Sequence, residues 1–343
     1  MSTFVLRCLG VLEVTLGATH ITNFATDKTR ALLAYLTLEA HRPHARAELL
    51  GLLWPELAQE AAQNSLRVTL HRLRETLERV QAGAGEALIL STRQTVQCNI
   101  QVATVDVFTF EQLMAACATH AHANLQQCDD CLTRLKTAAD LYGGELLTGF
   151  GVVDAPAFEE WLLLRRENLH QQALAALQQL VQAYETRGDH AQAYHYASRQ
   201  LTLDPTREEA HRQLMRILAR RGLRSEALAQ FESCCRILHH ELGVEPDLET
   251  VALYEQIRAG KLDRQTPTQG RTRQEDDSAA EQGLPAFRTA ERGSLSPAPP
   301  LPVYPTQQAA TEVPETGRVY GRAQERTQVA GWLVTEQCKV VAL

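Results

Sequence analysis

The sequence predicts a mainly α-helical protein, built from a small α+β domain, an all-α domain of stacked helices and a disordered linker. Alternating β-prone segments flank helical segments within the first hundred residues. Helical periodicity then dominates from residue 106 to about residue 261, and a polar, proline-rich segment follows. We therefore expect domains at 1–104 and 105–260, a flexible linker at 261–316 and a further short segment at 317–343.

The N-terminal domain has the element order of a winged helix-turn-helix. Thr26 or Asp27 is suited to cap the first helix, Pro43 breaks it, and Trp54-Pro55 stops the second. The expected elements are strands at 4–7 and 11–16, an extended piece at 20–23, helices at 27–39, 46–53 and 61–80, and a hairpin of strands at 87–91 and 95–100. In a winged helix the third helix enters the major groove of DNA and the hairpin, or wing, contacts the flanking backbone or minor groove.

The third helix, Ala61 to Val80, carries two different stripes at a period of 3.6 residues. One stripe is apolar and suited to pack on a core: Leu66, Leu70, Leu73 and Leu77. The other, roughly a quarter-turn away, is polar and basic: Asn64, Arg67, His71 and Arg74. Such a stripe is also typical of the solvated face of an ordinary surface helix, so the neighbouring elements decide between the two interpretations.

The polar stripe has the chemistry of a major-groove reader. Arg can donate two hydrogen bonds to guanine, Asn can pair in the same way with adenine, and further basic side chains can hold phosphate. We predict that Arg72 and Lys28 contact phosphate, and that Arg93, at the tip of the wing, contacts the DNA backbone or the minor groove. The residues predicted to contact bases are Asn64, Arg67, His71 and Arg74.

Composition narrows the classes of function. The net charge is −7 and the first hundred residues are nearly charge-balanced, so DNA binding would depend on a local basic patch. Eight cysteines, two of them adjacent, fit a reducing compartment better than a disulfide framework. No apolar run of about 18 residues and no signal-peptide pattern occurs, so we expect a cytoplasmic protein with no membrane partner. Neither G-x-S-x-G nor H-E-x-x-H is present, so we do not expect an enzyme.

A repeat is visible in the helical region. Arg187-Gly188 followed by Ala193 recurs as Arg221-Gly222 followed by Ala227, an offset of 34 residues. This is the period of tetratricopeptide repeats (TPR), in which small residues let paired helices approach. The expected helices are 108–119, 126–142, 155–187, 190–203, 207–221, 225–242 and 248–259. Since a TPR-like solenoid presents a concave groove, we expect this half to bind a protein or a helix.

One segment has a spacing typical of metal ligands. Cys128-Asp-Asp-Cys131 follows closely on Cys117, His120 and His122. Zinc prefers four thiolate or imidazole ligands in a tetrahedron, which Cys128, Cys131, His120 and His122 could supply. The spacing is shorter than in the usual zinc finger, and cysteines three apart on a helix also occur as small core residues. Structural zinc is therefore a hypothesis, and no other cofactor is expected.

Six motifs, in unbroken order, resemble those of the antibiotic-regulatory-protein (SARP) family of bacterial transcription activators. They are LGVLEV at 9–14, KTRALLAYL at 28–36, LLWP at 52–55, NSLRVTLHRLR at 64–74, LYGGELLTGF at 141–150 and ELGVEPDLETVALYE at 241–255. That family joins an OmpR-type winged helix to an all-helical bacterial transcriptional activator domain (BTAD). The resemblance covers about residues 4–258. It implies binding to promoter DNA and, through the helical domain, self-association or contact with RNA polymerase.

The last segment shows a second resemblance. VYGRAQERTQVAGWL, followed by a strand at 339–343, is similar to the opening segment of NB-ARC-type (STAND) P-loop ATPases, where Gly321, Arg322 and Glu325 match a Gly-Arg-x-x-Glu pattern. No G-x-x-x-x-G-K-[ST] motif is present, so we expect no ATP hydrolysis by that chemistry. The interpretation is a fragment or truncated form of a larger regulator.

Two hypotheses from different classes follow. The leading one is a sequence-specific transcriptional activator that binds promoter half-sites through the winged helix and binds partners, or itself, through the helical domain. The alternative is a TPR-like scaffold or signalling protein whose winged helix is a protein-docking module.

Overall fold

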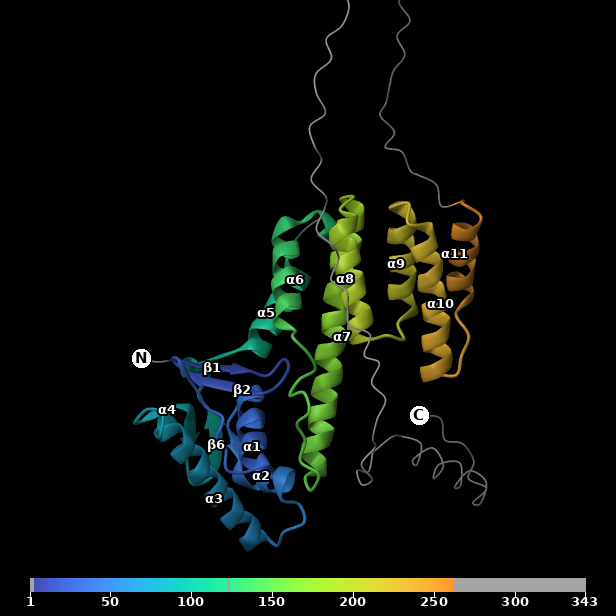
Figure 1. The fold of residues 1–343 in the computed structure, drawn as a ribbon. Helices are drawn as coiled ribbons and strands as arrows, with labels where there is room; N and C mark the ends of the chain where they lie inside the picture. Colours follow the sequence, from blue (N-terminus) through green and yellow to red (C-terminus); the bar gives the residue numbers. More distant parts are fainter. Residues whose placement is uncertain (1–2, 122–123, 262–343) are drawn as a thin grey trace, which may run out of the picture. The chain divides into compact units, whose positions relative to one another are not determined.

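The structure is a computed structural model that describes residues 3–121 and 124–261 (Figure 1). The predicted linker, apart from Lys261, and the predicted segment at 317–343 lie outside the described residues. Within the described residues, every strand lies before residue 106, and helices follow to residue 258. The expected mainly α fold, with a winged helix followed by a TPR-like helical domain, is confirmed. None of the described helices is long and apolar enough to cross a bilayer.

The first sheet of the N-terminal domain has four strands in the order β3-β2-β1-β7. Its members are β1 (Phe4–Arg7), β2 (Glu13–Leu16), β3 (Thr19–His20) and β7 (Ala103–Val105). Phe4 pairs with Leu16 in the antiparallel neighbour and with Ala103 in the parallel one. Strand β7 is absent from the elements expected from the sequence, because it is three residues long and its partner lies at the other end of the domain.

The second sheet carries the wing. Its order is β4-β6-β5, with β4 at His44–Ala45, β5 at Ile89–Ser91 and β6 at Thr95–Cys98. The strand expected at 87–91 is shorter because its first residues belong to a helix, α4 (Ala84–Leu88). The Glu78 carboxylate stabilises the start of α4 by accepting hydrogen bonds from the amides of Gly83 and Gly85, at 2.6 and 3.0 Å.

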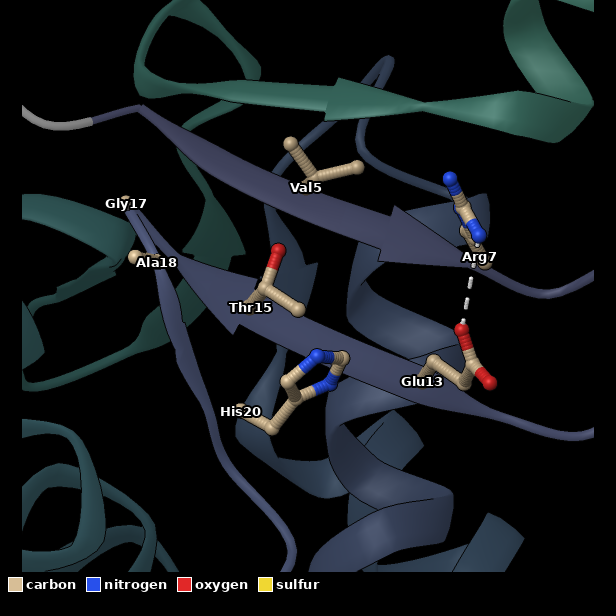
Figure 2. A pocket seen from close by; sticks show the side chains of 7 residues that line it. All are labelled: Val5, Arg7, Glu13, Thr15, Gly17, Ala18 and His20. Carbon is tan, nitrogen blue, oxygen red and sulfur yellow. Dashed lines mark ion pairs between the residues drawn. The ribbon is translucent and has the colours of Figure 1, made fainter.

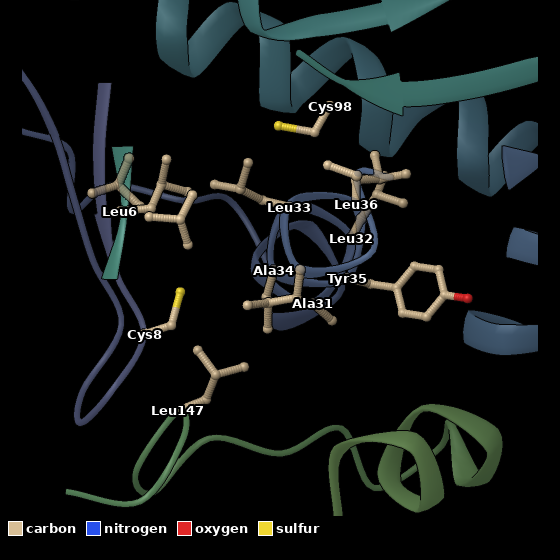
Figure 3. Packing of buried hydrophobic residues seen from close by; sticks show 14 of the residues in the cluster. Leu6, Cys8, Ala31, Leu32, Leu33, Ala34, Tyr35, Leu36, Cys98 and Leu147 are labelled. Carbon is tan, nitrogen blue, oxygen red and sulfur yellow. The ribbon is translucent and has the colours of Figure 1, made fainter. Parts of the chain in front are cut away.

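Three helices complete the winged helix: α1 (Asp27–Leu38), α2 (Arg46–Leu53) and α3 (Gln59–Glu78). The expected cap is present, since the Thr26 hydroxyl accepts a hydrogen bond from the amide of Thr29 at 3.2 Å. Helix α1 is almost wholly buried (Figure 3). Leu6 of β1 and Cys8, just after β1, contribute to its core, together with Cys98 from the wing and Leu147 from the helical domain. The N-terminal domain therefore shares one core with part of the helical domain.

Hydrogen bonds to the backbone of Cys8 and Leu9 fix this junction. The carboxylate of Asp106, at the start of α5, accepts hydrogen bonds from the amides of Cys8 and Leu9, at 2.8 and 2.9 Å. Within the 141–150 segment, the amide of Leu147 donates to the carbonyl of Cys8 at 2.8 Å. The LYGGELLTGF motif thus pairs, through isolated bridges of Leu146 with Leu9 and Gly10, with the segment that follows β1, and it ties the helical domain to the winged helix.

The helical domain consists of helices packed in sequence order. They are α5 (Asp106–Thr119), α6 (Asp129–Leu141), α7 (Pro156–Thr186), α8 (His190–Leu203), α9 (Glu208–Arg220), α10 (Arg224–Glu241) and α11 (Leu248–Arg258). A short 3-10 turn, Leu125–Gln127, precedes α6, which is why that helix starts later than expected. Helix α8 has the predicted bounds.

The expected 34-residue repeat has a physical counterpart in two helix ends. Gly188 and Gly222 follow α7 and α9 with positive φ angles of 75° and 80°, which glycine adopts without strain. In both turns the amide after the glycine donates to the carbonyl five residues earlier, at 2.9 Å. Ala193 and Ala227, at equivalent positions of the next helices, are fully buried. The repeated residues therefore produce the same turn and the same close helix approach.

Candidate nucleic-acid interface

The two stripes of α3 face in different directions, as the periodicity predicts. Leu66, Leu70, Leu73 and Leu77 are all buried in the core of the winged helix. Asn64, Arg67, His71 and Arg72 are exposed. A buried leucine stripe holds the helix in place, and so its opposite side is free to present polar groups to a large partner.

Arg67 and Asn64 form an interacting pair on the exposed side. The Arg67 guanidinium donates a hydrogen bond of 2.8 Å to the side-chain oxygen of Asn64. They lie one helical turn apart, in the first half of α3, and His71 follows Arg67 by one further turn. The contact orients the guanidinium and keeps two side chains with major-groove chemistry together.

Arg74 differs from the other members of the predicted base-reading stripe. It is only partly exposed, and its guanidinium donates a hydrogen bond of 2.9 Å to the carbonyl of Ile89, the first residue of β5. At about 100° per residue, Arg74 lies about 70° from the middle of the leucine stripe, whereas Asn64 lies about 150° from it. In this structure Arg74 therefore connects the recognition helix to the wing.

Lys28 was expected to contact phosphate, and the structure places it in an ion-pair network. Its ammonium lies 2.7 Å from a carboxylate oxygen of Asp154 and 3.5 Å from one of Glu56, and it lies over the Trp54 ring. The Lys28 side chain is 16% exposed. Because Asp154 precedes α7, the network joins the winged helix to the helical domain, and a phosphate contact would require these ion pairs to open.

The wing presents Arg93 at an exposed turn between β5 and β6. The Thr92 hydroxyl organises this turn by accepting hydrogen bonds from the amides of Gln94 and Thr95, at 3.1 and 2.9 Å. Arg46 supports it from α2 by donating to the carbonyl of Thr92 and to the hydroxyl of Ser91, at 3.1 and 2.8 Å.

Arg46 is not among the site residues expected from the sequence, although its position carries one signal. Arg46 is the first residue of α2, where the helix dipole disfavours a cation. A cation at that position is therefore expected to bind an acceptor outside its own helix, and in the structure the acceptors are the Thr92 carbonyl and the Ser91 hydroxyl of the wing.

Acidic side chains near the exposed side of α3 are engaged locally. Glu75 lies 2.7 Å from the guanidinium of Arg79, and the Glu78 carboxylate caps α4. Glu75 is thus paired with a cation and Glu78 is held by backbone amides, while Glu60, in the first turn of α3, is exposed.

The predicted metal ligands come together in part. His120, Cys128 and Cys131 have ligand atoms that all lie within 4.8 Å of one another. His122, the fourth residue of the hypothesis, lies outside the described residues.

A shallow hollow of about 340 Å³ lies on the outer face of the first sheet (Figure 2). Its lining includes Val5 and Thr15 on β1 and β2, and an ion pair between Arg7 and Glu13 with 3.7 Å between the charged atoms. It is a sheet surface with mixed polarity, distinct from the exposed side of α3.

Two family models match the chain. Residues 24–95 match "Transcriptional regulatory protein, C terminal", and residues 105–258 match "Bacterial transcriptional activator domain". Together with the winged helix and the helical repeats, these two matches give the chain the domain pair of SARP-type transcriptional regulators.

The relatives agree with this assignment. The chain is 30% identical over 223 residues to the regulatory protein AfsR of Streptomyces coelicolor, which covers 64% of this chain and 21% of that protein. It is 28% identical over 236 residues to AfsR of Streptomyces griseus, covering 68% of this chain and 22% of that protein. It is also 28% identical over 225 residues to the transcriptional regulator RedD of Streptomyces coelicolor, covering 64% of this chain and 60% of that protein. The chain thus spans about a fifth of the length of the two AfsR proteins.

A solved structure shares the fold. Mycobacterium tuberculosis EmbR, in complex with a low-affinity phosphopeptide, superposes with a TM-score of 0.54 at 22% identity, covering 75% of this chain and 65% of that chain. At this identity the likeness concerns the fold alone.

Proposed function

We propose that this chain is a sequence-specific transcriptional activator that reads promoter DNA with the exposed side of α3. The observation that carries the proposal is the Arg67–Asn64 pair, exposed and oriented by a hydrogen bond of 2.8 Å on a helix whose other side is buried. Arg and Asn are the side chains best suited to read guanine and adenine from the major groove. His71 extends the same surface.

The remaining predicted residues divide by what they contact. We assign Arg72 and Arg93, both exposed, to the DNA backbone or minor groove. Arg74 and Lys28 are assigned positioning roles, because Arg74 holds the wing strand and Lys28 pairs with Asp154. The proposed function is DNA binding, and it includes no catalytic step.

Pairing of half-sites is part of the proposal. A single winged helix buries too little surface to compete with bulk DNA, so activators of this kind bind repeated half-sites one or two DNA turns apart. We propose that the helical domain supplies self-association or contact with RNA polymerase. The shared core at Cys8 and Leu147 supports these separate roles for the two domains. Because it joins the domains, association of the helical domain would also position the winged helix.

We further propose that residues 317–343 open an NB-ARC-type segment, by the match at Gly321, Arg322 and Glu325. In a longer regulator of this kind, the nucleotide state of the ATPase would control access to the helical domain. A cytoplasmic location remains a prediction of the same kind.

The experiment that tests the function compares two charge reversals. Arg67→Glu places an anion on the proposed DNA surface, whereas Arg236→Glu makes the same change at an exposed position of α10. In a gel-shift titration of the full chain with its own upstream DNA, we expect Arg67→Glu to abolish specific binding and Arg236→Glu to retain it. If both variants bind as the wild type does, the winged helix is not a DNA reader and the protein-docking alternative is favoured.

A further inference from the structure

The loop that joins α5 to α6 brings together three side chains that metals favour. His120 ends α5, and Cys128 and Cys131 lie at the start of α6. The Nδ1 atom of His120 lies 3.1 Å from the Cys131 sulfur and 3.5 Å from the Cys128 sulfur. One imidazole nitrogen is thus shared by two thiols, an arrangement that hydrophobic packing of two cysteines does not require.

The separations between the His120 nitrogen and the two sulfurs are close to the edges of a zinc coordination tetrahedron. With Zn–S bonds of about 2.3 Å and Zn–N bonds of about 2.0–2.1 Å, a tetrahedral site places its sulfur and nitrogen ligands about 3.6 Å apart. The observed separations of 3.1 and 3.5 Å are shorter than this value, so the nitrogen and the sulfurs would move apart to admit the ion.

Cys117 is a further cysteine beside this cluster, outside the group of three residues whose ligand atoms all lie within 4.8 Å of one another. It lies one helical turn before His120 on α5, is buried, and its thiol donates to the carbonyl of Cys131 at 3.6 Å. The described ligands then read Cys117-x-x-His120 and Cys128-x-x-Cys131, two pairs joined by a short loop. Paired ligands with this spacing, one pair from each side of a turn, are typical of structural zinc sites.

The surroundings of the site favour a structural role for such an ion. Arg187, the residue that caps the end of α7, pairs with Asp129 at 2.7 Å and donates to the carbonyl of Gln126. The start of α6 is therefore already tied to the end of α7.

We propose that the α5–α6 loop is a structural zinc site whose ligands are Cys117, His120, Cys128 and Cys131. The ion would close the first helical hairpin of the activator domain and fix it against α7. This inference is independent of the proposed DNA function, because the ligands lie outside the winged helix.

Metal analysis of the full, untagged chain, purified under reducing conditions without chelator, tests the site. We expect about one zinc per chain, as in other closed structural sites. Cys128→Ser should lower this content at least tenfold, whereas Cys235→Ser, a matched change at another partly exposed cysteine, should leave it unchanged. Equal zinc content in the two variants, or a folded wild-type chain with less than about a tenth of an equivalent, would overturn the proposal.

Cobalt substitution provides a second measurement that does not depend on the folding of a variant. Wild-type protein loaded with Co²⁺ should show the intense visible bands of a tetrahedral site and a thiolate-to-metal charge-transfer band. Cys117→Ser should weaken the charge-transfer band by about a third, as expected for the loss of one of three thiolates. An octahedral spectrum in the wild type would refute the site, and an unchanged band in Cys117→Ser would refute Cys117 as a ligand.

Discussion

The indole nitrogen of Trp161, in α7, donates a hydrogen bond of 3.0 Å to the carboxylate of Glu39, the residue that caps the end of α1. The Trp161 ring also packs against Tyr35 of α1, with 4.9 Å between ring centroids. The longest helix of the activator domain is thus bound directly to the central helix of the DNA-binding domain. This contact and the shared core join the winged helix and the helical domain into one unit that we expect to unfold together.

Loss of the Trp161 hydrogen bond should weaken that unit. Trp161→Phe retains an aromatic ring but removes the donor, so we expect the free energy of unfolding to fall by about 1–3 kcal/mol. Urea denaturation of Trp161→Phe, Glu39→Ala and the double variant measures the coupling. We expect a coupling energy of at least about 0.5 kcal/mol, and strict additivity would show that the contact contributes no stability.

Lys28 distinguishes a joint between domains from a phosphate contact. Lys28→Met removes the ion pairs with Asp154 and Glu56, whose side chains are 62% and 47% exposed, so we expect a loss of about 1 kcal/mol of stability. The salt dependence of DNA binding should not change. Arg93→Ala is the matched comparison, and it should reduce the salt slope by about one. A reduced slope in Lys28→Met would return Lys28 to the DNA surface.

Glu48 makes stability depend on acid pH. The hydrogen bond from Arg42 is the largest of the contacts that lower its pKa from 4.5 to about 2, and His44 and Tyr35 act in the same direction. Since the folded pKa lies below the unfolded one, this stabilisation is complete above about pH 4.5 and is lost as pH falls towards 2.

The Glu48 side chain is 32% exposed, so we expect solvent screening to limit the effect to about 1 kcal/mol. Thermal unfolding between pH 5 and pH 2, at approximately constant ionic strength, compares the wild type with Glu48→Gln. The variant should be less stable at pH 5 and should show a shallower decline. Parallel pH profiles would show that Glu48 does not titrate with a lowered pKa.

Gly85 lies at a close approach between α3 and α4, the helix that leads into the wing. A Cβ atom there would lie 2.9 Å from the carbonyl oxygen of Arg74 and 3.0 Å from its Cα atom, so the backbone would have to move. We expect Gly85→Ala to lower stability by about 1–3 kcal/mol. Gly51→Ala is the control, because its Cβ meets nothing within 4 Å in α2, and it should be neutral or stabilising.

The sequence was sufficient for the helices and the fold class, because helical periodicity and caps are local properties. Helix α8 and the glycine turns at 188 and 222 follow directly from such patterns. It was insufficient for β7 and for the docking of the 141–150 segment on Cys8, since both depend on partners far away in the chain. The same holds for Lys28 and Arg74. Their charge and spacing predicted contacts with DNA. Only the structure shows that Lys28 contacts Asp154 and that Arg74 contacts the carbonyl of Ile89.

The most direct test of the central claim is selection of bound duplexes from a random double-stranded DNA pool by the full chain, with the wild type and Arg67→Ala in parallel. We predict that the wild type enriches a short half-site, repeated one or two DNA turns apart. Arg67→Ala should lose the preference at one base position, with a roughly 10-fold to 100-fold weaker affinity for the selected site, as expected for the loss of one bidentate base contact. A wild-type pool without an enriched motif, or an identical motif and affinity with Arg67→Ala, would contradict DNA reading by α3.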